Sequence, residues 1–271
     1  MNPGAFWSWW SGFAPWQTAA LIFSGLCIGL SKTGINGASA VMIPLLALIF
    51  GAKESTGVVL PMLCFADLVA VIYYRRAAEW KYIIRLLPWA LAGFGLALLV
   101  DRVVPARGFK ALIGACILTG LVVMFWNDRR GKAAAVSSAM PSATPSATAP
   151  ATPSAWWFSA IFGVMGGFST MIGNAAGPIM SVFLLSMRLR KTSFVGTAAW
   201  FFMIVNYLKV PLQLFVWHNI RVEGLLFGVT LIPAILAGAA LGVLVVKNVS
   251  ESRYRVIVYI MTIVSATLLF L

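Results

Sequence analysis

The amino-acid sequence predicts an all-α, polytopic membrane protein that is built from two inverted repeats. Three observations support this prediction. First, 61% of the 271 residues are hydrophobic and only 10% are charged, whereas a soluble domain carries about 25% charged residues. Second, apolar runs that are long enough for membrane helices recur along the whole chain. Third, a polar motif in the first half returns at the corresponding place in the second half.

The repeat is carried by glycine, serine and asparagine at a fixed spacing. The pattern Gly-x-x-x-Gly-x-Ser-x-x-x-x-Asn begins at Gly25 and begins again at Gly163. After a slip of one residue in the spacing, Asp67 aligns with Asn206. A hydrophobic chain that is duplicated around a polar, glycine-broken segment is typical of transporters, in which that segment holds the binding site.

Each half contains five apolar runs. They lie at about 16–33, 38–50, 56–74, 83–100 and 109–126 in the first half, and at about 155–172, 175–187, 194–216, 224–246 and 256–271 in the second. Most of them reach the roughly 17–25 residues that a spanning helix needs. The second run of each half is shorter and follows a glycine-rich break. We therefore expect the first two runs of each half to form a broken helix or a helix hairpin, followed by three spanning helices. The pattern leaves open whether the short runs cross the membrane or re-enter.

The chain divides into three segments. Residues 1–126 form the first membrane repeat, residues 127–155 a linker, and residues 156–271 the second membrane repeat. The linker is rich in Ala, Ser, Thr and Pro and has no apolar periodicity, so we expect it to be disordered and dispensable for the chemistry.

The basic residues predict the orientation. The net charge of +13 arises from 20 Lys and Arg that are scattered in short loops, which excludes the basic face of a nucleic-acid-binding module. If the linker is cytoplasmic, most of these residues lie on its side of the membrane, as the positive-inside rule requires. Both termini are then external. The two halves enter the membrane from opposite faces, which makes the repeat inverted.

The two breaks are the first candidate site. The residues concerned are Ser31, Lys32, Thr33, Gly34, Asn36 and Gly37, with Ser169, Thr170, Gly173 and Asn174 in the second half. Backbone groups that leave a membrane helix must be satisfied by protein or water, and the following half-helix directs its unpaired N–H groups into the break. Two such breaks that face each other would bind a small oxyanion. Alternatively, the GxxxG patterns here are only sites of close helix packing.

Ionisable residues inside the apolar runs are the second candidate. Lys32 is either the counter-charge to an anion or extends to the cytoplasmic interface. Asp67 is the only acidic residue deep within a run, and Lys209 lies one helical turn beyond its counterpart Asn206. Asp67 either forms an ion pair with Lys209 or binds and releases a proton during transport. We include Lys209 among the residues that supply charge to the substrate.

The sequence predicts no cofactor and no metal site. His218 is the single histidine, and the three cysteines are far apart without a CxxC pattern. An intramembrane enzyme would need paired carboxylates, a set of metal ligands or an activated nucleophile, and Asp67 has no carboxylate neighbour within the apolar runs. An anion channel is the closer alternative to a carrier, and saturation of the flux would distinguish the two.

Further motifs connect the sequence with a known family. They are Gly-Leu-Ser-Lys-Thr-Gly at 29–34 with Gly37 and Pro44, then Trp80 and Pro88-x-x-Leu-Ala-Gly, and the repeat in the second half. In this order the motifs resemble the TauE/SafE family of sulfite and organosulfonate exporters, over essentially the whole chain except the linker. The resemblance implies a carrier in the bacterial inner membrane. One departure is the segment 33–37, where many relatives have consecutive glycines.

Together these features predict a secondary transporter that exports sulfite, sulfoacetate or a related organosulfonate by alternating access. Membrane lipids and the small anion are its expected partners, with protons as a further candidate through Asp67. An anion that leaves a cell with a negative interior gains roughly 2.3 kcal/mol per charge at 100 mV, so export does not require a coupling ion. The sequence does not set the substrate, the direction of transport or the oligomeric state.

Overall fold

The computed structural model describes residues 12–51, 54–101, 156–220 and 222–268. These residues form ten α-helices and one short 3-10 helix, η1, with no strand among them. The all-helical class predicted from the sequence is thereby confirmed for this part of the chain. The predicted run at 109–126 and the linker at 127–155 lie outside the described residues.

The helices begin and end close to the predicted runs. In the first half they are α2 (Pro15–Thr33), η1 (Ala38–Val41), α3 (Met42–Phe50), α4 (Glu54–Tyr74) and α5 (Trp80–Val100). In the second half they are α7 (Trp156–Gly173), α8 (Ala176–Ser186), α9 (Lys191–Phe215), α10 (Val222–Thr230), α11 (Ile232–Asn248) and α12 (Glu251–Leu268). A proline opens α2, a position at which its missing N–H removes no helical hydrogen bond.

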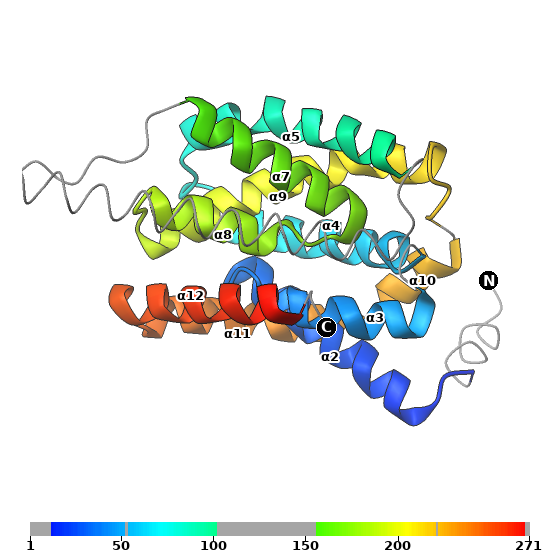
Figure 1. The fold of residues 1–271 in the computed structure, drawn as a ribbon. Helices are drawn as coiled ribbons and strands as arrows, with labels where there is room; N and C mark the ends of the chain where they lie inside the picture. Colours follow the sequence, from blue (N-terminus) through cyan, green and yellow to red (C-terminus); the bar gives the residue numbers. More distant parts are fainter. Residues whose placement is uncertain (1–11, 52–53, 102–155, 221, 269–271) are drawn as a thin grey trace, which may run out of the picture.

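Several of these helices have the length and composition of membrane spans. Among the described residues α4, α5 and α9 qualify singly, and α10 with α11 qualifies as a bent pair. By contrast α8 has 11 residues, which gives a length of about 16 Å, and α3 has only nine. Because a bilayer core is about 30 Å thick, neither short helix crosses it alone. In Figure 1, α7 runs toward one end of the molecule and α8 returns toward the other.

The fourth run of the second half differs from the single helix predicted at 224–246. It consists of α10 and α11, which meet at an angle of 53°. Pro233 lies in the first turn of α11, where a proline is tolerated because it does not have to donate a hydrogen bond there. In the first half, Pro88 of the matching motif lies inside the unbroken helix α5.

The most extensive helix contacts join the two halves. The helix α2 packs along α11, α5 packs along α7, and α4 packs against α9. Glycines make the first two contacts possible: a Cβ atom on Gly29 would lie 2.0 Å from the Ile235 carbonyl oxygen, and one on Gly167 would lie 2.1 Å from the Ala90 carbonyl oxygen. These GxxxG glycines therefore serve close helix packing, which is the alternative that the sequence left open.

Apolar side chains fill the interior and also cover the outside. The rings of Phe158, Phe162 and Phe183 contact one another in the largest core cluster. On the surface, Leu48 and Ile72 expose 73% and 65% of their area. Such an exposed apolar surface is suited to contact with lipid tails.

Candidate functional site

Both predicted breaks are present. The helix α2 ends at Thr33 and α7 ends at Gly173. The backbone then takes left-handed conformations, with φ of +97° at Gly37 and +53° at Asn174, a region that glycine and asparagine adopt more readily than other residues. The two breaks meet, because a Cβ atom on Gly177 would lie 3.3 Å from the Gly37 nitrogen.

Hydroxyl groups from neighbouring helices satisfy the carbonyl groups that the first break frees. This is the compensation that a helix break needs in a membrane. The Tyr74 hydroxyl donates to the Thr33 carbonyl oxygen at 2.9 Å. The Tyr254 hydroxyl donates to the Gly34 carbonyl oxygen at 2.7 Å, and the Ser265 hydroxyl donates to the Gly37 carbonyl oxygen at 2.9 Å.

We expect Tyr254→Phe to lower the free energy of unfolding by about 1–3 kcal/mol, because it leaves the buried Gly34 carbonyl without its donor. The measurement is the unfolding midpoint of purified protein in detergent. Tyr73→Phe is the matched control, since the Tyr73 side chain is 49% exposed. Equal midpoints for the two variants would contradict this role of the Tyr254 hydroxyl.

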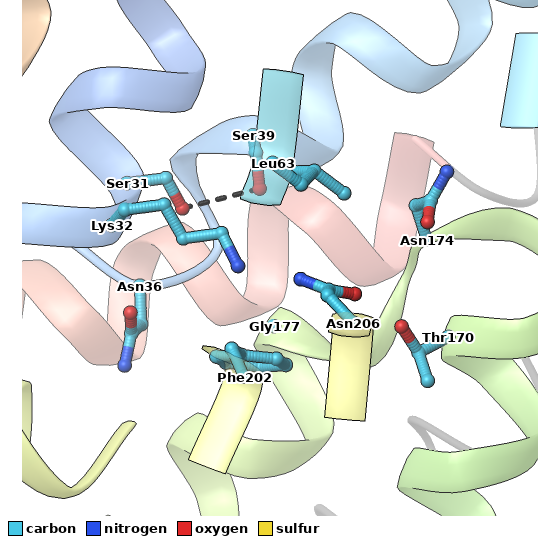
Figure 2. A pocket seen from close by; sticks show the side chains of 10 residues that line it. All are labelled: Ser31, Lys32, Asn36, Ser39, Leu63, Thr170, Asn174, Gly177, Phe202 and Asn206. Atoms are coloured by element: carbon cyan, nitrogen blue, oxygen red, sulfur yellow. Dashed lines mark hydrogen bonds between the residues drawn. The ribbon is translucent and has the colours of Figure 1, made fainter. Parts of the chain in front are cut away.

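A cavity lies between the two breaks. Its empty space, including the part that opens outward, is about 320 Å³. Figure 2 shows the side chains that line it, which come from both breaks and from the middle of α4 and α9: Ser31, Lys32, Asn36, Ser39, Leu63, Thr170, Asn174, Gly177, Phe202 and Asn206. Both halves of the chain therefore contribute to one site.

A buried ion pair supports one wall of this cavity. Lys32 Nζ lies 2.7 Å from Asp67 Oδ1, and the Asp67 side chain is fully buried. Asn206 Nδ2 donates to the other oxygen, Oδ2, at 2.6 Å, so the alignment of Asp67 with Asn206 in the repeat corresponds to a direct contact. The Lys32 ammonium also lies 4.2 Å from the centre of the Phe202 ring, a cation–π contact. Lys32 points into the cavity (Figure 2) rather than out to an interface.

Lys209 lies at the second break rather than against Asp67. It does not form the ion pair with Asp67 that was one of the two expectations, because α9 directs it toward the second break. Its Nζ donates to the Thr170 carbonyl oxygen at 2.9 Å and to Asn174 Oδ1. Lys209 is fully buried, and no carboxylate of the described residues forms an ion pair with it.

The electrostatics of the site favour an anion. Lys32 is paired with Asp67, whereas the buried Lys209 beside the cavity has no ion-paired carboxylate among the described residues. A buried charge without a counter-charge is costly. In addition, the Nδ2 group of the buried Asn36 has no hydrogen-bond partner among the described residues. The cavity therefore offers the ammonium of Lys32, which is paired with Asp67, and the unused donor of Asn36.

One known protein family matches nearly the whole chain. The family described as sulfite exporter TauE/SafE matches residues 21–269, a span that contains both breaks and every residue of the cavity. The chain belongs to the TauE/SafE family. The resemblance seen in the sequence motifs is thereby confirmed. No curated protein and no solved structure matches the chain.

Family membership fixes the broad class of the protein. TauE/SafE proteins are membrane exporters of sulfite and related anions and are not enzymes. The apolar helices of this TauE/SafE protein agree with a multi-pass membrane location.

The structure places the predicted site residues of this TauE/SafE protein in three settings. Ser31, Lys32, Asn36, Thr170, Asn174 and Asn206 line the cavity. Thr33 instead faces α11, where its Oγ1 lies 2.7 Å from the Ala239 carbonyl oxygen. Gly34 packs against Gly242, since a Cβ atom there would lie 2.6 Å from the Gly242 Cα.

The remaining predicted residues lie close to the cavity without lining it. Gly37 contacts Gly177 at the meeting point of the breaks. Ser169 is fully buried and its Oγ has no hydrogen-bond partner among the described residues. Gly173 lines a neighbouring cavity, and Lys209 reaches the site through Thr170 and Asn174.

Some cavity residues were not predicted, although the sequence contains a signal for two of them. Leu63 and Phe202 precede Asp67 and Asn206 by four residues, which places them on the same helical face. Ser39 lies beside Ser31, with the two hydroxyl oxygens 3.1 Å apart.

Proposed function

We propose that this TauE/SafE protein is a secondary transporter that exports sulfite, sulfoacetate or a related organosulfonate across the bacterial inner membrane by alternating access. The observation that carries the proposal is the cavity between the two breaks, in which both halves place donors around the buried ammonium of Lys32. A sulfite or sulfonate group presents several oxygen atoms that accept hydrogen bonds, and its negative charge can interact with this ammonium.

The cavity offers different surfaces for the two parts of an organosulfonate. Lys32, Asn36 and Thr170 supply a cation and neutral donors for the sulfur oxyanion. Leu63 and Phe202 supply an apolar wall for the short carbon chain. Asp67 forms an ion pair with Lys32 when no substrate is bound, so the ammonium is held in place before the anion arrives.

The packing of the helices supports an inverted repeat. The second-half helix α11 lies on α2, and the first-half helix α5 lies on α7, which is the exchange of partners that a pseudo-two-fold axis between the halves produces. In Figure 1, α2 and α7 also run in opposite directions, as do α4 and α9. Rocking of one half against the other around the cavity would then expose it to each side in turn.

Two basic turns support a cytoplasmic linker and external termini. The backbone nitrogen of Lys191, after α8, donates to the Glu251 carboxylate at the start of α12. Arg255 Nη2 donates to the Arg188 carbonyl oxygen. The α8–α9 and α11–α12 turns therefore lie at one end of the molecule (Figure 1). Positive charge that gathers at one end is typical of the cytoplasmic side.

The proposal is tested by sulfite efflux from proteoliposomes that contain purified protein, compared with sulfate, sulfoacetate and chloride. We expect saturable sulfite or sulfoacetate efflux, and a loss of at least about tenfold when Asn36→Ala and Asn174→Ala are combined, since the free donor of Asn36 and a polar side chain that Lys209 holds at the cavity edge are both removed. Asn248→Ala, at the exposed end of α11, is the matched control.

Each alternative has its own outcome in this assay. Wild-type flux in the double variant would reject the site. Flux of another anion without sulfite or sulfoacetate flux would reject the substrate. A current that does not saturate with anion concentration would identify a channel instead of a carrier.

A further inference from the structure

A second cavity lies next to the one between the breaks. Its empty space is about 260 Å³, and it is lined by residues of α3, by the first turns of α4, and by Gly173 and Asn174. Asn174 also lines the first cavity, where it stands at the edge opposite Lys32 (Figure 2). The Asn174 side chain is therefore the element that the two cavities share.

Both ends of the Asn174 side chain are held. Its Nδ2 donates to the Thr56 carbonyl oxygen near the start of α4 at 3.3 Å, and its Oδ1 accepts from Lys209 Nζ of α9. The side chain thus bridges two helices of different halves. Its backbone is in the left-handed region, with φ of +53°, a conformation that costs energy for a non-glycine residue and is common at functional sites.

The two hydrogen bonds differ in strength. The bond to Thr56 is long, at 3.3 Å, whereas the bond from Lys209 is short, so the bond to Thr56 is the weaker of the two. A displacement of the side chain that breaks the Thr56 bond and keeps the Lys209 bond is consequently the easier one. Such a displacement removes the side chain from between the cavities.

We propose that the Asn174 side chain is a movable partition between two parts of one substrate route, and that Lys209 is the residue that positions it. This inference rests on the proposed transport function, because it assigns the second cavity to the path of the same anion. Lys209 acts through Asn174 and Thr170, because its Nζ donates to both residues and does not itself line the first cavity.

The repeat partner of Asn174 provides a contrast. Asn36 lines the first cavity only, and its Nδ2 has no partner among the residues that the structure describes. Asn174 thus bridges two helices, whereas the side-chain amide of Asn36, at the equivalent position in the first half, is free to bind a substrate. Asn36→Ala is therefore the matched control for a change at Asn174.

The test measures access to each cavity without measuring transport. Cys27, Cys64 and Cys116 are replaced by alanine, and Ser39→Cys in the first cavity or Ile43→Cys in the second is introduced singly. A charged methanethiosulfonate reagent is then applied to one face of sealed vesicles at a time. From the face that labels Ile43→Cys, we expect slow labelling of Ser39→Cys.

Removal of the partition should change this result. Asn174→Gly deletes the side chain while glycine accepts the left-handed backbone. We expect it to raise the labelling rate of Ser39→Cys from the Ile43→Cys face by about tenfold, as expected for the loss of the two hydrogen bonds that hold the side chain in place. Lys209→Met should raise the same rate, whereas Asn36→Ala should leave it unchanged.

Two results would overturn the partition. One is that Ser39→Cys and Ile43→Cys are labelled at equal rates from the same face while Asn174 is still present. This result would be informative without any change at Asn174. The other is an unchanged rate in both Asn174→Gly and Lys209→Met. Absence of sulfite and sulfoacetate flux together with the expected labelling would reject the proposed substrate and leave the partition standing, so the two failures are distinguishable.

Discussion

Replacing Lys32 with methionine is expected to abolish saturable anion efflux and to lower the free energy of unfolding by about 3–5 kcal/mol, the usual cost of removing one partner of a buried ion pair. The carboxylate of Asp67 is fully buried and would keep only the amide of Asn206 as a partner. The flux would fall for a separate reason, since the cavity would lose the cation that attracts the substrate.

A double variant separates these two effects. Lys32→Met combined with Asp67→Asn removes both charges, so we expect most of the stability to return while the flux stays absent. Flux is measured in proteoliposomes, and stability as the unfolding midpoint in detergent. Recovery of flux in the double variant would show that Lys32 serves only the ion pair.

Gly167→Ala is expected to lower the free energy of unfolding by about 3 kcal/mol, near the upper end of the range for overpacked sites. The added Cβ atom would lie 2.1 Å from the Ala90 carbonyl oxygen. This neighbour is backbone and cannot rotate aside, so α5 and α7 would have to separate. The unfolding midpoint of the purified variant is the measurement.

Gly95→Ala is the control on the same pair of helices. A Cβ atom on Gly95 meets no other atom within 4 Å, so the change should be neutral or should stabilise α5 by up to about 1 kcal/mol through helix propensity. A loss of stability in both variants would show that the close approach at Gly167 is not the cause.

Much of the fold could be predicted from the sequence because apolar length and glycine breaks are local signals. The breaks after Thr33 and Gly173 arose where the repeat placed them. The bend between α10 and α11 was not predicted, because Pro88 and Pro233 stand in the same motif and yet only Pro233 lies next to a break. The local sequence does not determine which proline is accommodated.

The candidate site was predictable in part for a different reason. The repeat aligned Asp67 with Asn206, and these residues are in contact. The partner of Asp67 was not determined, because Lys32 and Lys209 are both basic residues inside apolar runs. The choice between them depends on how α2 and α9 are placed around α4, which is a property of the packed helices.

The pairing of α2 with α11 also has a consequence for synthesis. Thr33 and Ala239, which are joined by a hydrogen bond in this seam, are separated by 206 residues. A ribosome that adds about 5–20 residues per second needs roughly 10–40 s to cover that distance. Among the described residues, the helix that packs on the glycine face of α2 comes from the second half, so it is absent during this interval. The helix α2 is therefore made early and completes this contact late, and the nascent protein is most exposed to misassembly and degradation until α11 arrives.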